Sequence, residues 1–416
     1  MKLRIVIPLY SYSVNEKSFV YGGDNPGVGG TQFVSIMLAI GLAKQYPDLD
    51  VLLLNEKPVN IFQSFPNLRQ VEYAFNDVLD SDFLKSSETI LLSPVAILDR
   101  WSTACSNFKC KVIAWHHHPF DLNLASQAIR CDAHVSVGSY QYFSNNSFFD
   151  SHWHIQNIFF EANELMSGYS EFDIASHAAM RFVFLGALIP AKGFHYVVQS
   201  WPEIRRVFPN STLDVIGSTS TYSGHEPEDS QIPTTKDYAS EIIKYLPQED
   251  IDNGRVVFHG NLGVEKKAII QRAHVAILNP TGSSEAFPAS PLECMSHGVP
   301  VIASDDFGMS DVMRFFPQLS LRRPADIPSR ITWLFSDYNR YQEMRSRSID
   351  VARWYAGQSQ SSLLRWRQLF ELISLKQSIY SNPPVLPFHG NKINLLTRRW
   401  KRRLSSFKNS YYSRKV

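Results

Sequence analysis

The sequence contains few cysteines and no long hydrophobic run. Its 416 residues include four cysteines, which form neither a CxxC pair nor the spacing of a secreted disulfide framework. We therefore expect reduced thiols in a cytoplasmic protein, and no zinc site. The longest apolar stretch, residues 33–43, is interrupted by Ser35 and Gly41 and is too short to span a bilayer. Residues 1–8 have the pattern of a first strand rather than of a signal peptide.

Acidic residues are absent after Glu371. Ten of the 41 lysines and arginines lie beyond it, so the first 371 residues carry 31 basic and 39 acidic side chains, although the whole chain has a net charge of +2. Between residues 393 and 407, apolar side chains at helical spacing alternate with cations, a pattern that suits an anionic membrane surface. We predict peripheral binding at the inner face of the membrane. A solvated tail over residues 385–416 is the main alternative, and we expect no nucleic-acid partner, although cation runs alone do not discriminate.

The tight Gly-x-Gly-x-x-Gly turn of dinucleotide-binding folds is also missing. A longer glycine-rich loop, residues 22–31, follows the first apolar run instead and leads into a helix predicted over residues 31–44. A Rossmann dehydrogenase is therefore disfavoured. Free amides at the start of the helix, at Gly29 and Gly30, favour binding of an anion, whereas the alternative is a plain mobile loop.

Short apolar runs alternate with helical patterns in two series along the chain. They cover residues 3–9, 51–55, 89–92, 112–115 and 133–137, and then 182–185, 213–216, 256–258, 275–278 and 299–303. Continuous apolar runs favour parallel strands that are covered on both faces, and the alternation favours doubly wound α/β sheets. The polar, irregular segment 161–180 separates the two series. We predict two Rossmann-like domains, over residues 1–165 and 175–345.

Two further helices are expected in the second half of the chain. One covers residues 265–273, directly before the 275–278 strand. The other covers residues 361–376 within a C-terminal helical segment, 346–376, that packs back toward the N-terminal domain. Its apolar face is predicted to consist of Leu363, Leu364, Leu369, Phe370 and Ile373.

Two glutamates bracket the loop and helix start that follow the 275–278 strand. Glu285 lies on the loop, and Glu293 lies just inside the next helix, which has Pro291 in its first turn. Open α/β sheets bind ligands outside the carboxyl ends of their strands, so both carboxylates can project into one crevice. Carboxylates accept paired hydrogen bonds from vicinal hydroxyls, which suits a sugar and a ribose. The alternative is that both are solvated surface glutamates.

Histidines and a lysine follow other predicted strands. His116, His117 and His118 come after the 112–115 strand, but successive side chains diverge, so they cannot all face one pocket. Lys192 precedes a glycine in the first strand–helix connection of the second series, where a mobile cation can meet a diphosphate. A surface lysine and exposed loop histidines are the alternatives. We predict no metal ion, because no further ligands are evident.

Taken in order, these motifs resemble those of the retaining, family 4 glycosyltransferases (group 1), which have the GT-B fold. The shared motifs are the glycine loop, a histidine after an N-terminal strand, Gly-x5-Lys-Gly over residues 186–193, and Glu-x7-Glu over 285–293 followed by residues 295–304. The resemblance spans residues 1–372 and is most specific in 256–304. It implies two Rossmann-like domains that face each other across a cleft, with a nucleotide sugar held mainly by the C-terminal domain.

The resemblance also implies a role for each residue. Glu293 would bind the ribose hydroxyls and Glu285 the donor sugar. Lys192, helped by the amides of Gly29 and Gly30, would neutralise the leaving diphosphate, where charge builds up in the transition state. His116 is the best match for the family's histidine near the sugar, with His117 and His118 as alternates. The expected catalytic residues are thus His116, Glu285 and Lys192, and the other expected donor-binding residues are Gly186, Phe287, Ser290, Pro291 and Leu292.

Two positions depart from the family pattern. Ala187 stands where the family commonly has arginine, so one phosphate-binding cation is missing. Residues 286–288 are Ala-Phe-Pro instead of Gly-Phe-Gly, and Pro288 has no N–H to donate to a sugar. A separate subfamily, an unusual donor or reduced activity would account for these changes.

The resulting hypothesis is a retaining, metal-independent glycosyltransferase of hexosyltransferase type. It would move a sugar from a nucleotide-sugar donor, without a further cofactor, to a saccharide or lipid-linked saccharide, in the synthesis of a polysaccharide, cell-envelope glycan or glycolipid. The alternative is a non-catalytic nucleotide-sugar-binding or scaffold protein of the same fold.

Overall fold

The computed structural model describes most of the chain between residues 2 and 384. The described residues are 2–9, 17–73, 81–101, 108–118, 131–145, 149–160, 180–220, 227, 231–377 and 382–384. The predicted linker, apart from Met180, lies outside them, and so does the tail, residues 385–416. No helix within the described residues is both long enough and apolar enough to cross a membrane.

The N-terminal half forms a seven-stranded, fully parallel sheet with the order β5-β3-β1-β6-β7-β8-β9. Apolar clusters cover both faces of this sheet, as expected for doubly wound strands. A short parallel pair, β2 with β4, lies beside it. The strands are β1 (Arg4–Pro8), β2 (Ser18–Phe19), β3 (Asp50–Asn55), β4 (Asn60–Ile61), β5 (Leu68–Glu72), β6 (Thr89–Pro94), β7 (Lys111–His116), β8 (Ala133–Ser136) and β9 (His152–His154), and the helices are α1 (Gly30–Gln45), α2 (Val95–Arg100) and α4 (Ser139–Asn145).

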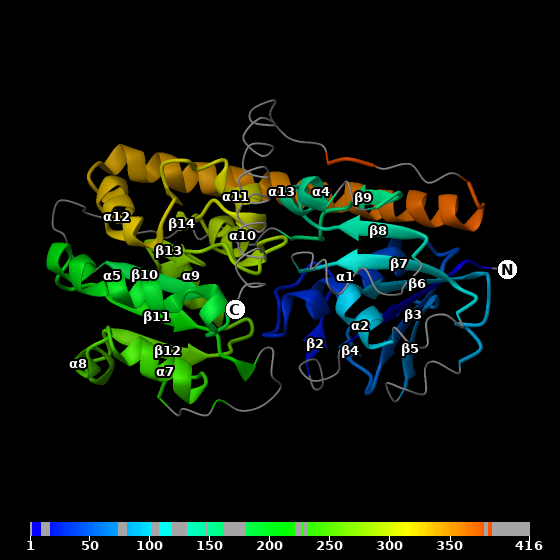
Figure 1. Ribbon diagram of the computed structural model, residues 1–416, viewed down its shortest axis with the longest axis horizontal. Coiled ribbons are helices and arrows are strands. Elements are labelled where there is room, and N and C mark those ends of the chain that lie inside the picture. Colours follow the sequence, from blue (N-terminus) through cyan, green and yellow to red (C-terminus); the bar gives the residue numbers. More distant parts are fainter. Residues whose placement is uncertain are drawn as a thin grey trace, which may run out of the picture.

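The C-terminal half forms a six-stranded parallel sheet with the order β12-β11-β10-β13-β14-β15. Its strands are β10 (Arg181–Leu185), β11 (Thr212–Ile216), β12 (Val256–Gly260), β13 (Val275–Leu278), β14 (Val301–Ser304) and β15 (Ser320–Leu321). The helices are η5 (Pro190–Lys192), α5 (Phe194–Val207), α7 (Lys236–Ile243), α8 (Gln248–Asp252), α9 (Lys266–Arg272), α10 (Ala289–Ser296), η6 (Phe307–Met309), α11 (Ser310–Met313), η7 (Pro324–Asp326), α12 (Ile327–Phe335) and α13 (Tyr338–Ser374). The two sheets lie side by side, one in each domain (Figure 1).

The predicted strands all occur, but the short pair β2 and β4 was not predicted, and neither were three strands at the edges of the two large sheets. These are β5, β9 and β15. Strand β5 (Leu68–Glu72) is Leu-Arg-Gln-Val-Glu, with no fully buried residue, and β9 and β15 are only three and two residues long. Edge strands are half covered and therefore lack the continuous apolar run that identifies a central parallel strand.

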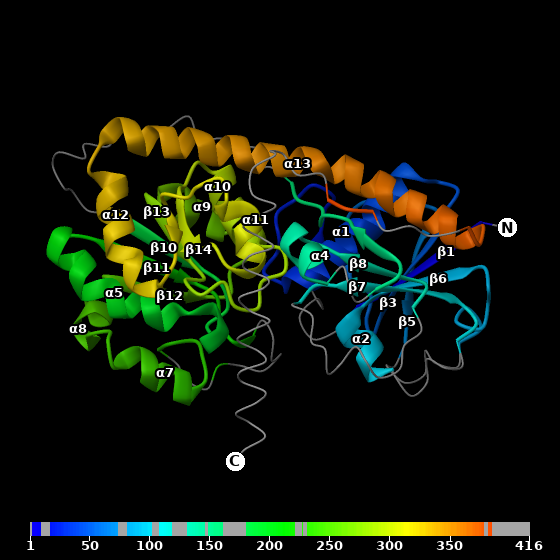
Figure 2. The ribbon, with the colours of Figure 1, turned by 45° about the horizontal axis from the view of Figure 1, so that its top comes forward.

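The C-terminal helical segment is a single helix, α13, which begins at Tyr338 and not at the predicted residue 346. The side chain of Asp337 caps it by accepting a hydrogen bond from the backbone N–H of Arg340. Figure 2 shows α13 running along both domains. The predicted apolar face is wrong at one position, because Leu364 is 51% exposed whereas Trp366, which was not predicted, is buried.

Helix α13 contributes to the hydrophobic cores of both domains. Its first part packs into the C-terminal core through Tyr341, Met344, Val351, Ala352 and Tyr355. Its last part packs into the N-terminal core through Leu363, Trp366, Leu369, Phe370 and Ile373. The helix thereby connects the two domains side by side, with the pocket described next between them.

Candidate functional site

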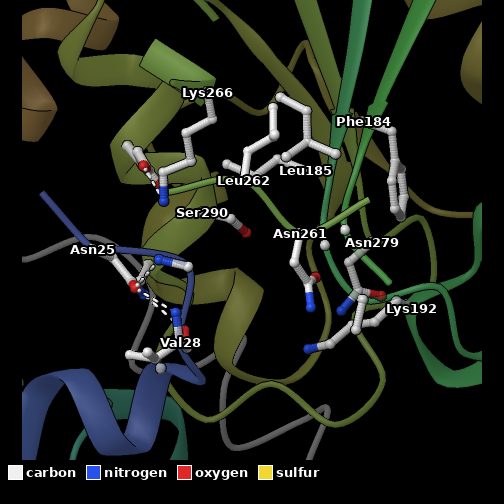
Figure 3. A pocket seen from close by; sticks show the side chains of 18 of the residues that line it. Asn25, Val28, Phe184, Leu185, Lys192, Asn261, Leu262, Lys266, Asn279 and Ser290 are labelled. Carbon is white, nitrogen blue, oxygen red and sulfur yellow. Dashed lines mark hydrogen bonds and ion pairs between the residues drawn. The ribbon is translucent and has the colours of Figure 1, made fainter. Parts of the chain in front are cut away.

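A pocket lies between the two domains, at the ends of strands of the C-terminal sheet. The C-terminal domain contributes loops that follow β10, β11 and β13, together with the start of α10. The N-terminal domain contributes the glycine loop before α1. Figure 3 shows side chains from both domains around this interdomain pocket. It occupies the carboxyl edge of the C-terminal sheet, where open α/β sheets bind ligands.

The glycine loop reaches across to the C-terminal domain. A Cβ atom at Gly27, whose φ is +90°, would lie 3.0 Å from the carbonyl oxygen of Leu262, so only glycine permits this approach. The Asn25 side chain holds the loop, because its Oδ1 accepts hydrogen bonds from the backbone N–H groups of Gly27 (3.0 Å) and Val28 (2.9 Å) (Figure 3). These hydrogen bonds fold the loop against the C-terminal domain.

Helix α1 starts directly at the pocket. Gly29 is its N-cap residue, and no described side chain caps the helix there. Gly30 lines the pocket, whereas Gly29 does not. Backbone amides at an uncapped helix start carry partial positive charge and can bind an anionic ligand.

Glu285 and Lys192 form an ion pair at the pocket. The Asn279 side-chain amide also donates a hydrogen bond of 3.3 Å to Glu285 Oε1. Positive φ angles occur at Asn279 (36°) and Ser284 (61°), both within the loop between β13 and α10 that carries Glu285. Non-glycine residues adopt this conformation only where their surroundings impose it, and such strain is concentrated at functional sites.

Glu293 extends from α10 into the same pocket and is paired with a lysine that was not predicted. Lys266 Nζ lies 2.8 Å from Glu293 Oε1, and the Lys266 side chain is only 7% exposed. Lys266 lies on the buried side of α9 with Ile269 and Ile270. A lysine at an apolar position of an amphipathic helix is the sequence signal that could have revealed it.

The three consecutive histidines have different surroundings, and none of them is among the residues that line the pocket. His116 is buried. Its Nε2 lies 3.0 Å from His134 Nδ1, and burial lowers its pKa well below the usual value. The His117 ring packs against Trp115 at 4.2 Å between ring centroids. His118 is exposed, and the protein around it lowers its pKa, with a further lowering by Lys192 and an opposing effect of Glu285. Of the three, His118 is thus the one that interacts with the ion pair.

Most of the predicted donor-binding residues meet in this pocket. Its lining includes Gly30, Gly186, Lys192, Glu285, Phe287, Ser290 and Glu293. Leu292 instead belongs to the hydrophobic core and is fully buried, and Pro291 does not line the pocket. Both follow from the helical spacing of α10, which directs Ser290 and Glu293 to the pocket and turns the residues between them toward the protein interior.

The predicted departures at positions 187 and 288 also fall at the pocket. Ala187 lines it, so no charge is present there. Pro288 is the N-cap residue of α10, and the helix start that follows it, at Ala289 and Ser290, also lines the pocket. Pro288 thus supplies no N–H of its own, whereas the unpaired backbone amides at the start of α10 remain as donors for a ligand.

Comparison with protein families identifies the C-terminal part. Residues 176–350 match the family described as glycosyl transferases group 1. The matched region, less than half of the chain, is thus similar to a group 1 glycosyl transferase domain. This region contains Lys192, Lys266, Glu285 and Glu293. A search of curated proteins gives no match.

Solved structures show that the two domains together have the GT-B fold. Sucrose-phosphate synthase from Thermosynechococcus elongatus has a TM-score of 0.62 and 15% identity, over 90% of this chain and 100% of that chain. Anabaena HepE in complex with UDP-glucose has a TM-score of 0.60 and 13% identity, over 88% and 99%. A glycosyltransferase from Rickettsia africae has a TM-score of 0.60 and 11% identity, over 91% and 100%.

Proposed function

We propose that this protein is a retaining glycosyltransferase that moves a sugar from a nucleotide-sugar donor to a saccharide or lipid-linked saccharide. The observation that carries the proposal is the pairing of each motif glutamate with a lysine in one pocket, Glu285 with Lys192 and Glu293 with Lys266. The pocket thus combines hydrogen-bond acceptors for sugar hydroxyls with cations for phosphates.

Each end of the pocket suits a different part of such a donor. Glu293 accepts hydrogen bonds from the ribose hydroxyls, and Glu285 accepts them from the hydroxyls of the sugar. The diphosphate lies between them, within reach of Lys192 and of the amides at Gly30. When the bond between the anomeric carbon and the phosphate oxygen breaks, its electron pair leaves with the diphosphate. Lys192 and the amides stabilise this charge more in the transition state than in the ground state.

His118 takes the role that the sequence resemblance implied for His116. Its surroundings lower its pKa, so it is neutral at pH 7 and can exchange hydrogen bonds with a sugar hydroxyl. His116 instead has a structural role, because its ring packs beside His134 and Phe149, with centroids 5.3 Å from each.

The proposal also includes an acceptor, a pathway and a location in the cell. A lipid-linked acceptor agrees with the basic segment 393–407 predicted to bind an anionic membrane surface from the cytoplasmic side. The reaction would then contribute to a polysaccharide, a cell-envelope glycan or a glycolipid. No metal ion is required in this scheme, because lysines and helix amides carry the positive charge.

Nucleotide release from a panel of UDP-, GDP- and ADP-sugars tests the proposal, with and without saccharide and lipid-linked acceptors. UDP-glucose belongs in the panel because HepE binds it. We expect turnover of one donor class and retention of the anomeric configuration in the product, measured by NMR. Binding of a donor without turnover in any combination would instead favour the non-catalytic alternative, in agreement with Ala187 and Pro288.

A further inference from the structure

The interdomain pocket has no charged side chain at position 187, where the resemblance leads us to expect an arginine. Without it, the positive and negative side chains that line the pocket are equal in number. Among the described residues that line it, Lys192 and Lys266 are the cations and Glu285 and Glu293 the anions. A nucleoside diphosphate brings at least two negative charges into this space. Lys192 and the start of α1 face only part of that charge, so a second cation for the diphosphate is needed within the pocket.

Lys266 has the properties of that cation. It lies on the buried side of α9, where its neighbours on the same side are isoleucines. Burial of an ammonium group is costly, and replacement of a buried ion pair by apolar residues is often neutral or stabilising. The stability of the fold therefore does not account for a lysine at this position, whereas a charged ligand does.

The two lysines approach the pocket from different elements. Lys192 comes from η5 and Lys266 from α9, and Figure 3 shows them on opposite sides of the pocket. Lys192 is paired with Glu285 and Lys266 with Glu293. An ammonium group has three N–H donors, and the 2.8 Å contact with Glu293 Oε1 uses one of them. The others can reach a ligand that lies against Glu293.

We infer that Lys266 is a second donor-binding cation, which replaces the charge absent at Ala187. It fixes the Glu293 carboxylate for the ribose hydroxyls and donates to a phosphate oxygen at the nucleoside end of the diphosphate. This inference rests on the proposed function. It adds a residue that selects ribonucleoside diphosphates at the end of the pocket opposite Lys192.

The test compares nucleoside and nucleoside diphosphate binding to full-length variants by calorimetry. UDP, GDP and ADP are used with uridine, guanosine and adenosine, and the pair that the unmodified protein binds most tightly is taken forward. We expect Lys266→Met to weaken diphosphate binding tenfold or more and nucleoside binding clearly less. Lys266→Arg keeps the charge and should retain most of the diphosphate preference. In turnover assays, Lys266→Met should raise the KM for the donor with little change in kcat.

Lys267→Met is the matched control, because it removes the same charge from the next position of α9, outside the pocket lining. It should bind nucleotides as the unmodified protein does.

Two results with Lys266→Met would overturn the second-cation role. One is an equal loss of affinity for the nucleoside and for the nucleoside diphosphate, which would show that Lys266 only orients Glu293. The other is unchanged binding of both. If the unmodified protein binds no nucleotide, the proposed function fails together with this inference. Binding without turnover overturns only the catalytic proposal.

Discussion

At the scale of single residues, the two motif glutamates have separate partners and should have separate effects. Glu293→Gln should weaken binding of the nucleoside diphosphate about tenfold, or about 1.4 kcal/mol, because it removes a charged acceptor for the ribose and the partner of Lys266. Glu285→Gln should lower kcat at least tenfold with little effect on nucleotide affinity, because we propose that Glu285 binds the sugar and not the nucleotide. Calorimetry with the nucleotide and initial rates with the donor measure the two effects.

The histidines give a second comparison between residues. His118→Ala should lower kcat about tenfold or more without a change in the midpoint of thermal unfolding, because His118 is exposed beside the Lys192–Glu285 pair. His116→Ala should lower that midpoint instead, since His116 is buried beside His134. Steady-state kinetics and a thermal melt of both variants decide the assignment. The opposite result would restore His116 as the residue at the sugar.

The residues of the site were predictable only where a motif marks them. The eight-residue spacing of Glu285 and Glu293 and the Lys-Gly sequence at Lys192 were enough to predict that these side chains share one pocket. The choice between His116 and His118 was not predictable, because it depends on the direction of each side chain at the end of β7. Lys266 belongs to no motif, and its place on the apolar side of α9 is the only sequence signal for it, which is weak because the helix is short.

At the scale of elements, the loop after β8 and the loop that carries Glu285 meet closely across the two domains. A Cβ atom at Gly138 would lie 2.1 Å from the carbonyl oxygen of Ala286. The adjacent start of α4 is fixed by Asp311, whose Oδ1 accepts hydrogen bonds from Ser139 Oγ (2.6 Å) and from the Tyr140 N–H (3.0 Å). The position of the loop that carries Glu285 thus depends on the N-terminal domain.

Gly138→Ala should therefore separate these loops and impair turnover. We expect kcat to fall tenfold or more, because backbone atoms cannot give way by the roughly 1 Å that the new methyl group requires. Gly357→Ala is the control, since its Cβ would meet no atom within 4 Å and alanine favours the helical backbone of α13. Unfolding midpoints show whether each variant folds, and unchanged turnover in Gly138→Ala would contradict a role for this contact.

The elements themselves were largely predictable because central parallel strands are continuous apolar runs. All predicted runs became strands, and α1 and α9 lie within a residue of their expected positions. The edge strands β5 and β9 were not predictable in this way. Strand β5 is partly exposed to solvent and β9 is only three residues long, so neither contains a continuous apolar run. The full length of α13 was missed because its first half faces one domain and its second half the other, so no single apolar face runs along it.

At the scale of the whole molecule, buried histidines in the N-terminal domain should make folding sensitive to acid. Burial lowers the pKa of His134 to about 4 and that of His152 and His154 to about 3. Below about pH 6.5 these histidines bind protons in the unfolded chain but stay neutral in the folded protein. Their contribution to the free energy of unfolding is therefore complete above that pH and is lost as the pH falls toward 3. Each such histidine contributes a slope of up to about 1.4 kcal/mol per pH unit.

Urea unfolding between pH 7 and pH 4 measures this dependence. The free energy of unfolding should decrease steadily below about pH 6.5, which is the unfolded value for histidine. The variant His152→Asn removes one titrating group and should flatten the slope, whereas a change at the exposed His118 should alter it less. A stability that does not vary between pH 6.5 and pH 4 would contradict neutral buried histidines.

The basic segment also belongs to this scale, because it follows an acidic body. Full-length protein should float with anionic liposomes and not with zwitterionic ones, since each nearby cation contributes about 1 kcal/mol at an anionic surface. A chain ending at residue 385 should stay in solution in both cases. Equal flotation of the two proteins would remove the membrane prediction and leave the solvated tail.

Helix α13 has a consequence for the order in which the protein can be assembled. The N-terminal core includes Trp366 and Phe370. In the sequence, the entire C-terminal domain lies between these two residues and the rest of that core. During synthesis the first domain therefore leaves the ribosome with part of its apolar surface uncovered. This surface is covered only after the second domain has folded and the last turns of α13 have packed against the first domain. The domain that is made first is thus the one completed last.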